Sequence, residues 1–123
     1  MLCSHHVALS VVKLFLSLRT AILEDPTSQV VANNTRATFY CRAKGEELEW
    51  VVNGEFASVP RNERLTSQGV ILSDPTQMMH GEYSNTIVIP ANVHFNQTRV
   101  LCLTLNLTDS KQSSEAVLIV AGT

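Results

Sequence analysis

Two cysteines are the residues of this chain best suited to covalent chemistry. Cys41 and Cys102 stand about sixty residues apart, whereas Cys3 lies in an N-terminal segment that has the character of a leader. In an oxidising compartment such a pair most simply forms one disulfide, and in the cytosol the same residues would be two buried thiols. No zinc site is expected, because the sequence has no Cys-x-x-Cys pair and neither His80 nor His94 clusters with a cysteine.

Three Asn-x-Ser/Thr triplets are candidate N-glycosylation signals. They begin at Asn33, Asn96 and Asn106, and each falls in a loop or at the end of a predicted strand, where a transferase could reach it. The alternative is three solvated asparagines in turns. Together with a leader and a disulfide, the triplets favour a secretory route.

The sequence offers little for catalysis. It contains no G-x-S-x-G elbow and no glycine-rich phosphate loop. Cys41 lies in the middle of an apolar strand face, which favours a disulfide over a nucleophile. The acidic residues Glu46, Glu47 and Glu49 are explained by strand alternation as a solvated edge rather than a calcium site. We therefore expect no catalytic residue, no metal and no cofactor, and the chain is not expected to be an enzyme.

The N-terminal segment is typical of a secretory signal. Residues 7–18 are apolar with three exceptions, and the run is shorter than the ~20 residues that span a bilayer. The small residue Ala21 follows soon after, so we predict a signal peptide over residues 1–21. The alternative is an irregular N-terminal extension. No second hydrophobic stretch follows, and we predict no membrane anchor within the chain and a location outside the cell, either secreted or at the cell surface.

The charge balance argues against two kinds of partner. The chain has 9 basic and 11 acidic residues, for a formal net charge of −2. Neither sign dominates, so a nucleic-acid partner or binding to an anionic lipid surface is not indicated.

The cysteines and the candidate glycosylation sites must be positioned by short runs of alternating apolar and polar residues. Such alternation, with turn residues between the runs, is typical of antiparallel strands with one buried face. Asn53-Gly54 predicts a hairpin turn that leads to a short strand near Phe56. The predicted strands cover residues 35–43, 48–52, 84–89, 99–105 and 115–121, and one more short strand is expected within residues 65–72, which Gly69 interrupts. Pro90 is expected to end the strand of residues 84–89, and residues 106–114 are expected to form a polar loop. Alternation places Phe39, Cys41, Ile87 and Ile89 inside a single all-β domain over about residues 24–121.

At Cys41, Trp50 and Cys102 the chain resembles an immunoglobulin superfamily domain, over about residues 27–121. The resemblance implies an immunoglobulin-like antiparallel β-sandwich. In that fold a disulfide joins strands B and F, and a Trp of strand C packs against it. Val100 stands where the fold commonly has a Tyr, and both an intermediate-type and a variable-type domain fit the cysteine spacing.

The same alternation predicts an exposed apolar face. If Val100 and Cys102 point inward, Leu101, Leu103 and Leu105 point outward on strand F, with Val51 beside them on strand C. In the resembled fold this C–F–G sheet commonly binds partners, so we predict a recognition or adhesion module. Its partner would be a protein, either another immunoglobulin-like domain or a cell-surface receptor. The alternatives are a covering segment or a one-residue register shift, which would turn these side chains to the other face.

Two other functions remain open from the sequence. One is a structural spacer that forms part of a larger multi-domain ectodomain. The other is a small secreted carrier or enzyme, which a ligand-sized internal cavity would support and a tightly packed core would not.

Overall fold

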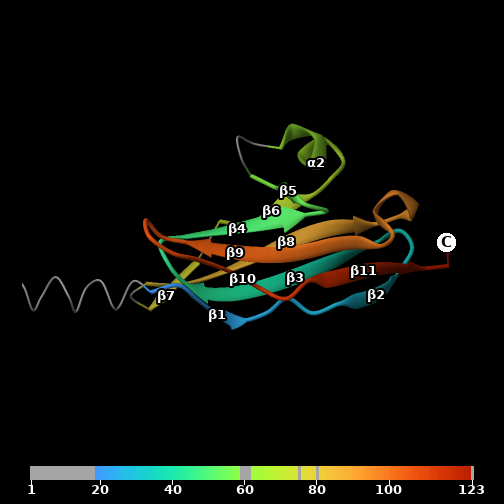
Figure 1. Ribbon diagram of the computed structural model, residues 1–123. Coiled ribbons are helices and arrows are strands. Elements are labelled where there is room, and N and C mark those ends of the chain that lie inside the picture. The colour runs from blue at the N-terminus through green and yellow to red at the C-terminus, as the bar shows by residue number, and fades with distance from the viewer. Residues whose placement is uncertain (1–18, 59–61, 75, 80, 123) are drawn as a thin grey trace, which may run out of the picture.

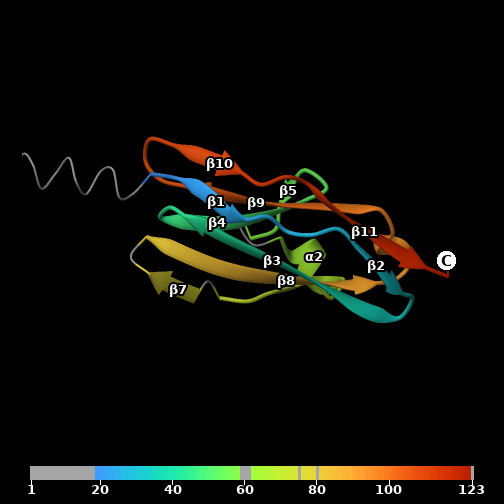
Figure 2. The same ribbon diagram turned by 90° about the horizontal axis from the view of Figure 1, so that it is seen from below.

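The computed structural model describes residues 19–58, 62–74, 76–79 and 81–122. The predicted signal-peptide core of residues 7–18 and the histidine at position 80 lie outside these ranges. Two β-sheets pack face to face, with β3 and β8 in one layer and β9 and β11 in the other (Figures 1 and 2). The described chain enters at one end of this sandwich, and β11 ends at the other (Figure 1).

The first sheet is built on one long antiparallel pair. β3 and β8 pair along ten residues, from Thr35 opposite Ala91 to Lys44 opposite Glu82. The strand order is β1-β3-β8-β6, and β7 also pairs with β8. The strands are β1 (Ala21–Glu24), β3 (Thr35–Lys44), β6 (Ile71–Leu72), β7 (Thr76–Met79) and β8 (Glu82–Ala91).

The second sheet has the order β2-β11-β9-β4-β5, and β10 also pairs with β9. The strands are β2 (Gln29–Ala32), β4 (Glu47–Val52), β5 (Glu55–Phe56), β9 (Thr98–Leu105), β10 (Ser110–Gln112) and β11 (Ala116–Ala121). β2 and β11 run parallel, with Gln29 opposite Leu118. Every other strand pair in the described part of the chain is antiparallel, so the predicted antiparallel sandwich is confirmed with this one exception.

The core lies between the two sheets. The inward residues of β3, β4 and β8 are buried, among them Phe39, Ile87 and Ile89 at 0% exposure and Trp50 at 2%. Cys41 of β3 and Cys102 of β9 form a disulfide between the sheets. The predicted pairing is confirmed, and the fold is an immunoglobulin-like β-sandwich with one inter-sheet disulfide.

Two tight turns place β4. Only Gly45 and Glu46 separate β3 from β4, and a Cβ atom at Gly45 would lie 2.1 Å from Oγ1 of Thr104. After β4, the predicted Asn53-Gly54 hairpin turn is confirmed, because both residues have positive φ angles (50° and 83°) and Val52 pairs with Glu55. This geometry suits a two-residue hairpin between twisted strands.

The short strand predicted within residues 65–72 is confirmed at the end of that range, but a helix that was not predicted precedes it. A short helix, α2 (Glu63–Ser67), comes first, and only Ile71–Leu72 form a strand, β6. Asn62 caps the helix by accepting a hydrogen bond from the backbone N–H of Leu65 at 3.3 Å, and Leu65 is buried. The cap and one buried apolar residue explain a single helical turn where alternation alone indicated a strand.

The prediction that Pro90 ends its strand is wrong. β8 continues through Pro90 to Ala91, with Pro90 opposite Arg36 of β3. On its other edge β8 pairs with β6 only at Ile87 and Val88. A proline is tolerated where its missing N–H has no strand to face.

Four strands were not predicted. β10 lies within the expected polar loop of residues 106–114, and all three of its residues are exposed. β1, β2 and β7 are four residues each, too short for alternation to be recognised. A 3₁₀ turn, η1 (Val93–Phe95), connects β8 to β9.

The sandwich begins before residue 24. Thr20 is buried, and Ala21 is the first residue of β1, opposite Lys44. A leader cleaved after Ala21 would therefore remove the start of β1. The signal peptide and its cleavage point stay predictions.

Candidate recognition face

The four predicted binding residues lie together on the outer side of the second sheet. Val51 on β4 and Leu101, Leu103 and Leu105 on β9 are all half-buried, and they alternate with fully buried neighbours. Val51 is directly opposite Leu101, close enough for the two side chains to pack against each other. We call this outward-facing side of β2, β4, β5, β9 and β11 the outer face.

The outer face has apolar members that the sequence analysis did not identify. Phe56 on β5 is 43% exposed and lies opposite Val51. Counting outward from the Asn53-Gly54 turn would have found this pair. Val30 and Ile119, which are 71% and 38% exposed, are opposite each other across the parallel β2–β11 pair. The sequence does not predict this pairing, because parallel strands are not joined by a hairpin turn that could be recognised in it.

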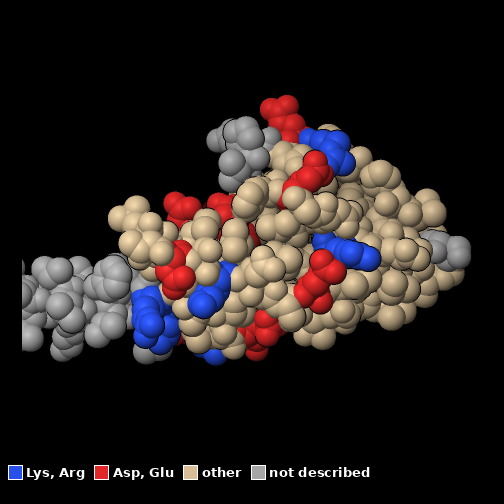
Figure 3. All heavy atoms as spheres, viewed as in Figure 1, with Lys and Arg blue, Asp and Glu red and all other residues tan. Residues whose placement is uncertain are grey.

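Polar side chains border the apolar residues. Glu49 is opposite Leu103, and its carboxylate accepts a hydrogen bond from the hydroxyl of Ser58. Arg99 and Glu115 form an exposed ion pair at 3.8 Å. Seen from the side of Figure 1, acidic and basic residues form small separate groups with uncharged surface between them (Figure 3). The apolar residues of the outer face therefore form a stripe across the strands with a charged border.

The β9–β10 loop at one end of this face is held by its own side chains. Asn106 accepts hydrogen bonds through Oδ1 from the backbone N–H groups of Thr108 at 3.0 Å and Asp109 at 2.8 Å. This turn leaves Leu107 93% exposed at its tip. An ordered loop with an exposed leucine is suited to contact a partner.

A hydrogen bond ties this loop to the start of the sandwich. The hydroxyl of Thr20 donates to the carboxylate of Asp109, which also accepts from the backbone N–H of Ser110. The hydrogen bond from Thr20 is the main reason that the pKa of Asp109 is lowered below its ordinary value. The ionised carboxylate therefore holds the loop and the first residues of the domain together.

The three predicted glycosylation asparagines have different surroundings. Asn33 is exposed in the β2–β3 turn. Asn96 is half-buried, and its Oδ1 accepts a hydrogen bond from the backbone N–H of Val120 at 2.9 Å. The β2–β3 turn and the β8–β9 connection lie at the end where β11 finishes, whereas the β9–β10 loop of Asn106 lies at the opposite end (Figure 1). Glycans at these positions would leave the middle of the outer face open, and their occupancy stays a prediction.

Among the described residues, no group of three or more His, Cys, Asp or Glu side chains is placed to hold a metal ion. Within the same ranges, no helix is long and apolar enough to cross a membrane.

Comparison with known proteins bears on the fold. No protein-family model matches the chain, and no curated protein matches it either. The chain is similar to the crystal structure of Rst D1-D2, with a TM-score of 0.59 and 20% sequence identity over 82% of this chain. It spans about half the length of that structure (48%). At this identity the likeness shows the fold alone, and the fold that it shows is the immunoglobulin-like β-sandwich.

Proposed function

We propose that this domain is an extracellular recognition module that binds a protein partner through the outer face. It would belong to a cell-surface or secreted receptor or adhesion protein of the immunoglobulin superfamily. The observation that carries the proposal is the apolar stripe from Phe56 through Val51 and Leu101 to Leu103 and Leu105. Contiguous apolar surface with a polar rim marks association sites on soluble domains.

The stripe offers a partner both an anchor and a flat platform. Phe56 is an exposed aromatic residue at the edge of the sheet, and such residues often dominate interface energies. The half-buried leucines of β9, one strand beyond Val51, have cross-strand neighbours that hold them in place, so they would lose little side-chain entropy on binding. Binding would be driven by burial of this surface, with the charged border setting orientation.

The disulfide supports an extracellular location. The bond between Cys41 and Cys102 persists in secretory and extracellular compartments and is rare in the cytosol. The immunoglobulin-like fold is compatible with the same location.

The test is a charge placed in the stripe. Leu103→Glu adds a carboxylate opposite Glu49, which should repel a docked apolar surface without disturbing the buried side of β9. Val93→Glu is the matched control, because Val93 is 74% exposed on η1 and lies outside the outer face. Fluorescent tetramers of the wild type and both variants would be applied to cell lines, and self-association would be measured by sedimentation.

We expect Leu103→Glu to reduce cell binding or self-association at least about tenfold, which is ordinary for a charge placed at an interface centre. Val93→Glu should bind as the wild type does. Urea unfolding must show that both variants remain folded. Equal binding by the two variants would remove the outer face as the recognition surface.

A spacer role is the second candidate. The described chain enters at one end of the sandwich and β11 ends at the other (Figure 1), which suits a domain joined in line with neighbours. Under this alternative the outer face would show no binding in any assay. Adding or removing a domain, which changes the length of the ectodomain, would alter function instead.

A further inference from the structure

One edge of the first sheet is left open where the chain changes sheets. β1 pairs with β3 only at one end, from Arg42 to Lys44. The chain then continues to β2, which pairs with β11 of the second sheet (Figure 2). In the part of the chain that the structure describes, residues 35–41 of β3 therefore have no strand beside them on this side. An open strand edge is a template for pairing with another chain.

Every second residue of this edge turns its backbone N–H and C=O groups outward. The carbonyl of Thr38 does so, because it accepts a hydrogen bond from the side-chain amide of Gln29 at 2.5 Å. Its second lone pair remains available. Backbone groups alternate between the two sides of an antiparallel strand, so those of Arg36 and Tyr40 point the same way as those of Thr38. Among the described residues, no backbone group bonds to Arg36 or Tyr40 on this side.

A polar pocket of about 280 Å³ lies beside the open edge. The residues that line it are Glu24, Asp25, Thr27, Gln29, Thr38 and Tyr40. Glu24 is exposed and lies opposite Arg42, but the guanidinium of Arg42 is bonded to Glu82. Within the described ranges, Glu24 has no ion pair. Two carboxylates beside the 37% exposed ring of Tyr40 form a site that suits a guanidinium group.

The same edge carries a guanidinium group without an anionic partner. Arg36 is exposed on β3, and no ion pair joins it to another described residue. Its side chain lies on the same solvent side of the sheet as that of Tyr40, but the two residues are about 14 Å apart along the extended strand. The edge therefore presents a cation at one end and a complementary acidic pocket at the other. A second copy in the antiparallel direction would bring each cation to the other copy's pocket.

We propose that two copies of this chain pair antiparallel through their open β3 edges, about a two-fold axis at Thr38. Thr38 is the midpoint of residues 35–41, so this register covers the open edge of both copies and stops short of β1. Arg36 of each copy lies opposite Tyr40 of the other, and their backbone groups exchange hydrogen bonds. The Arg36 side chain contacts the Tyr40 ring and approaches the Glu24 carboxylate. The contact occurs twice, as in every isologous interface.

This surface belongs to the first sheet, whereas the outer face belongs to the second sheet. The two surfaces can be tested separately, and the pairing of two copies does not rest on the proposed function. Because Asn33 lies in the turn that precedes β3, the protein would be produced without glycans and with its disulfide formed. Its sedimentation equilibrium would be measured from about 1 µM to about 1 mM, a range that detects weak dimers.

Exchange of charges tests the contact. The wild type should show a monomer–dimer equilibrium within this concentration range. Arg36→Glu and Glu24→Arg should each weaken dimerisation at least about tenfold, because like charges would then face each other at both ends of the interface. The double variant restores opposite charges and should recover most of the affinity. Arg64→Glu is the control, since it reverses an exposed charge on α2 and should leave the dimer unchanged.

Cysteines test the register in a Cys3→Ser background. Thr38→Cys would place two identical residues opposite each other at a Cα separation of about 5.5 Å, which a disulfide can bridge. A covalent dimer should form under mild oxidation. Tyr40→Cys is the control, because the two copies of residue 40 would lie about 14 Å apart, beyond the reach of a disulfide. Urea unfolding must show that each variant remains folded.

Three results would overturn the proposal. The first is a wild type that stays monomeric up to about 1 mM, which would make Arg36 and Gln29 protectors of the edge against pairing. The second is a dimer whose affinity neither Arg36→Glu nor Glu24→Arg changes; loss of that dimer in Leu103→Glu would assign self-association to the outer face. The third is equal covalent dimer formation by Thr38→Cys and Tyr40→Cys, which would show that the copies meet without this register.

Discussion

Reduction of the disulfide between Cys41 and Cys102 should strongly destabilise this domain. The bond closes a loop with a sequence separation of 61 residues. In the chain-entropy model a loop of this length lowers the entropy of the unfolded chain by about 14 cal/mol/K, which corresponds to about 4 kcal/mol at 25 °C. Native domains have only about 5–15 kcal/mol of folding stability in total, so the reduced domain should lose a substantial part of it.

The comparison is between the oxidised protein and its dithiol in a Cys3→Ser background, which prevents pairing with a third thiol. Both cysteines of the pair are 0% exposed, so reduction leaves two small buried apolar groups and little change in packing. With a urea dependence of about 2 kcal/mol per molar, the unfolding midpoint should fall by about 2 M. Circular dichroism and Trp50 fluorescence, followed together, would report whether unfolding is a single transition.

A loss below about 1 kcal/mol would refute this reasoning. It would mean that the reduced unfolded chain already holds the two strands near each other, or that the oxidised native state is strained. A loss of about 4 kcal/mol in the free energy of unfolding, with an unchanged urea dependence, would support the entropic account.

Two further predictions concern the glycines of two turns and the pKa of Asp109. Gly45→Ala should destabilise the domain by about 3 kcal/mol, because its Cβ would displace the hydroxyl of Thr104, which is buried and bonded to the Lys44 carbonyl at 2.8 Å. Gly54→Ala meets no atom within 4 Å and should cost only about 1 kcal/mol from its positive φ; equal losses in urea unfolding would contradict this. Thr20→Val should raise the pKa of Asp109 in a carboxyl NMR titration, because the Thr20 hydrogen bond is the main cause of its lowering. The pKa of Asp109 is lower in the folded state than in the unfolded state. The Thr20–Asp109 hydrogen bond therefore stabilises the folded domain fully at pH values above the unfolded pKa, and this stabilisation is lost as the pH falls through the folded pKa. An unchanged Asp109 pKa in Thr20→Val would count against this prediction.

The sequence predicted the central strands because each has a buried face and a polar face. Phe39 and Cys41 on β3, and Ile87 and Ile89 on β8, follow a period of two that only a half-buried strand requires. The Asn53-Gly54 turn was predictable for a different reason, since few dipeptides accept two successive positive φ angles.

The edges of the sheets were not predictable in the same way. β10 has no buried residue, so its sequence carries no alternation, and its pairing with β9 is determined by the β9–β10 loop. Helix α2 is one turn long and depends on the cap from Asn62, which alternation does not detect. Tertiary position decided both elements, and local pattern did not.

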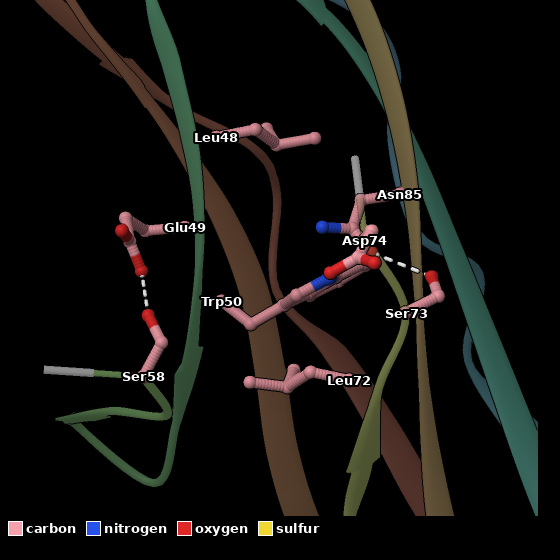
Figure 4. Close-up of a pocket in the computed structure, with 8 residues that line it drawn as sticks. All are labelled: Leu48, Glu49, Trp50, Ser58, Leu72, Ser73, Asp74 and Asn85. Carbon is pink, nitrogen blue, oxygen red and sulfur yellow. Dashed lines mark hydrogen bonds between the residues drawn. The ribbon is translucent and has the colours of Figure 1, made fainter. Parts of the chain in front are cut away.

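The residues of the outer face differ in the same respect. Val51 and Leu103 could be placed on the outer face because their strands alternate, whereas Val30 joins the face only through the parallel β2–β11 pair. A surface pocket lined by Leu48, Trp50 and Asp74 (Figure 4) brings β4 beside a segment whose position in space the sequence does not encode locally. A site made at the meeting of two sheet edges requires the three-dimensional structure.

The parallel pairing of β2 and β11 has a mechanical consequence. Four residue pairs, from Gln29 opposite Leu118 to Ala32 opposite Ala121, join the strands. The chain reaches β2 from one end of the sandwich and leaves β11 at the other end (Figure 1). Tension applied along the domain would load these hydrogen bonds in shear, all together, rather than one after another. Because forced unfolding is governed by the unfolding rate, such a clamp would slow rupture more than its small size suggests. Once it opened, the disulfide would still keep the segment between Cys41 and Cys102 from extending, so the domain would lengthen under load by only part of its chain.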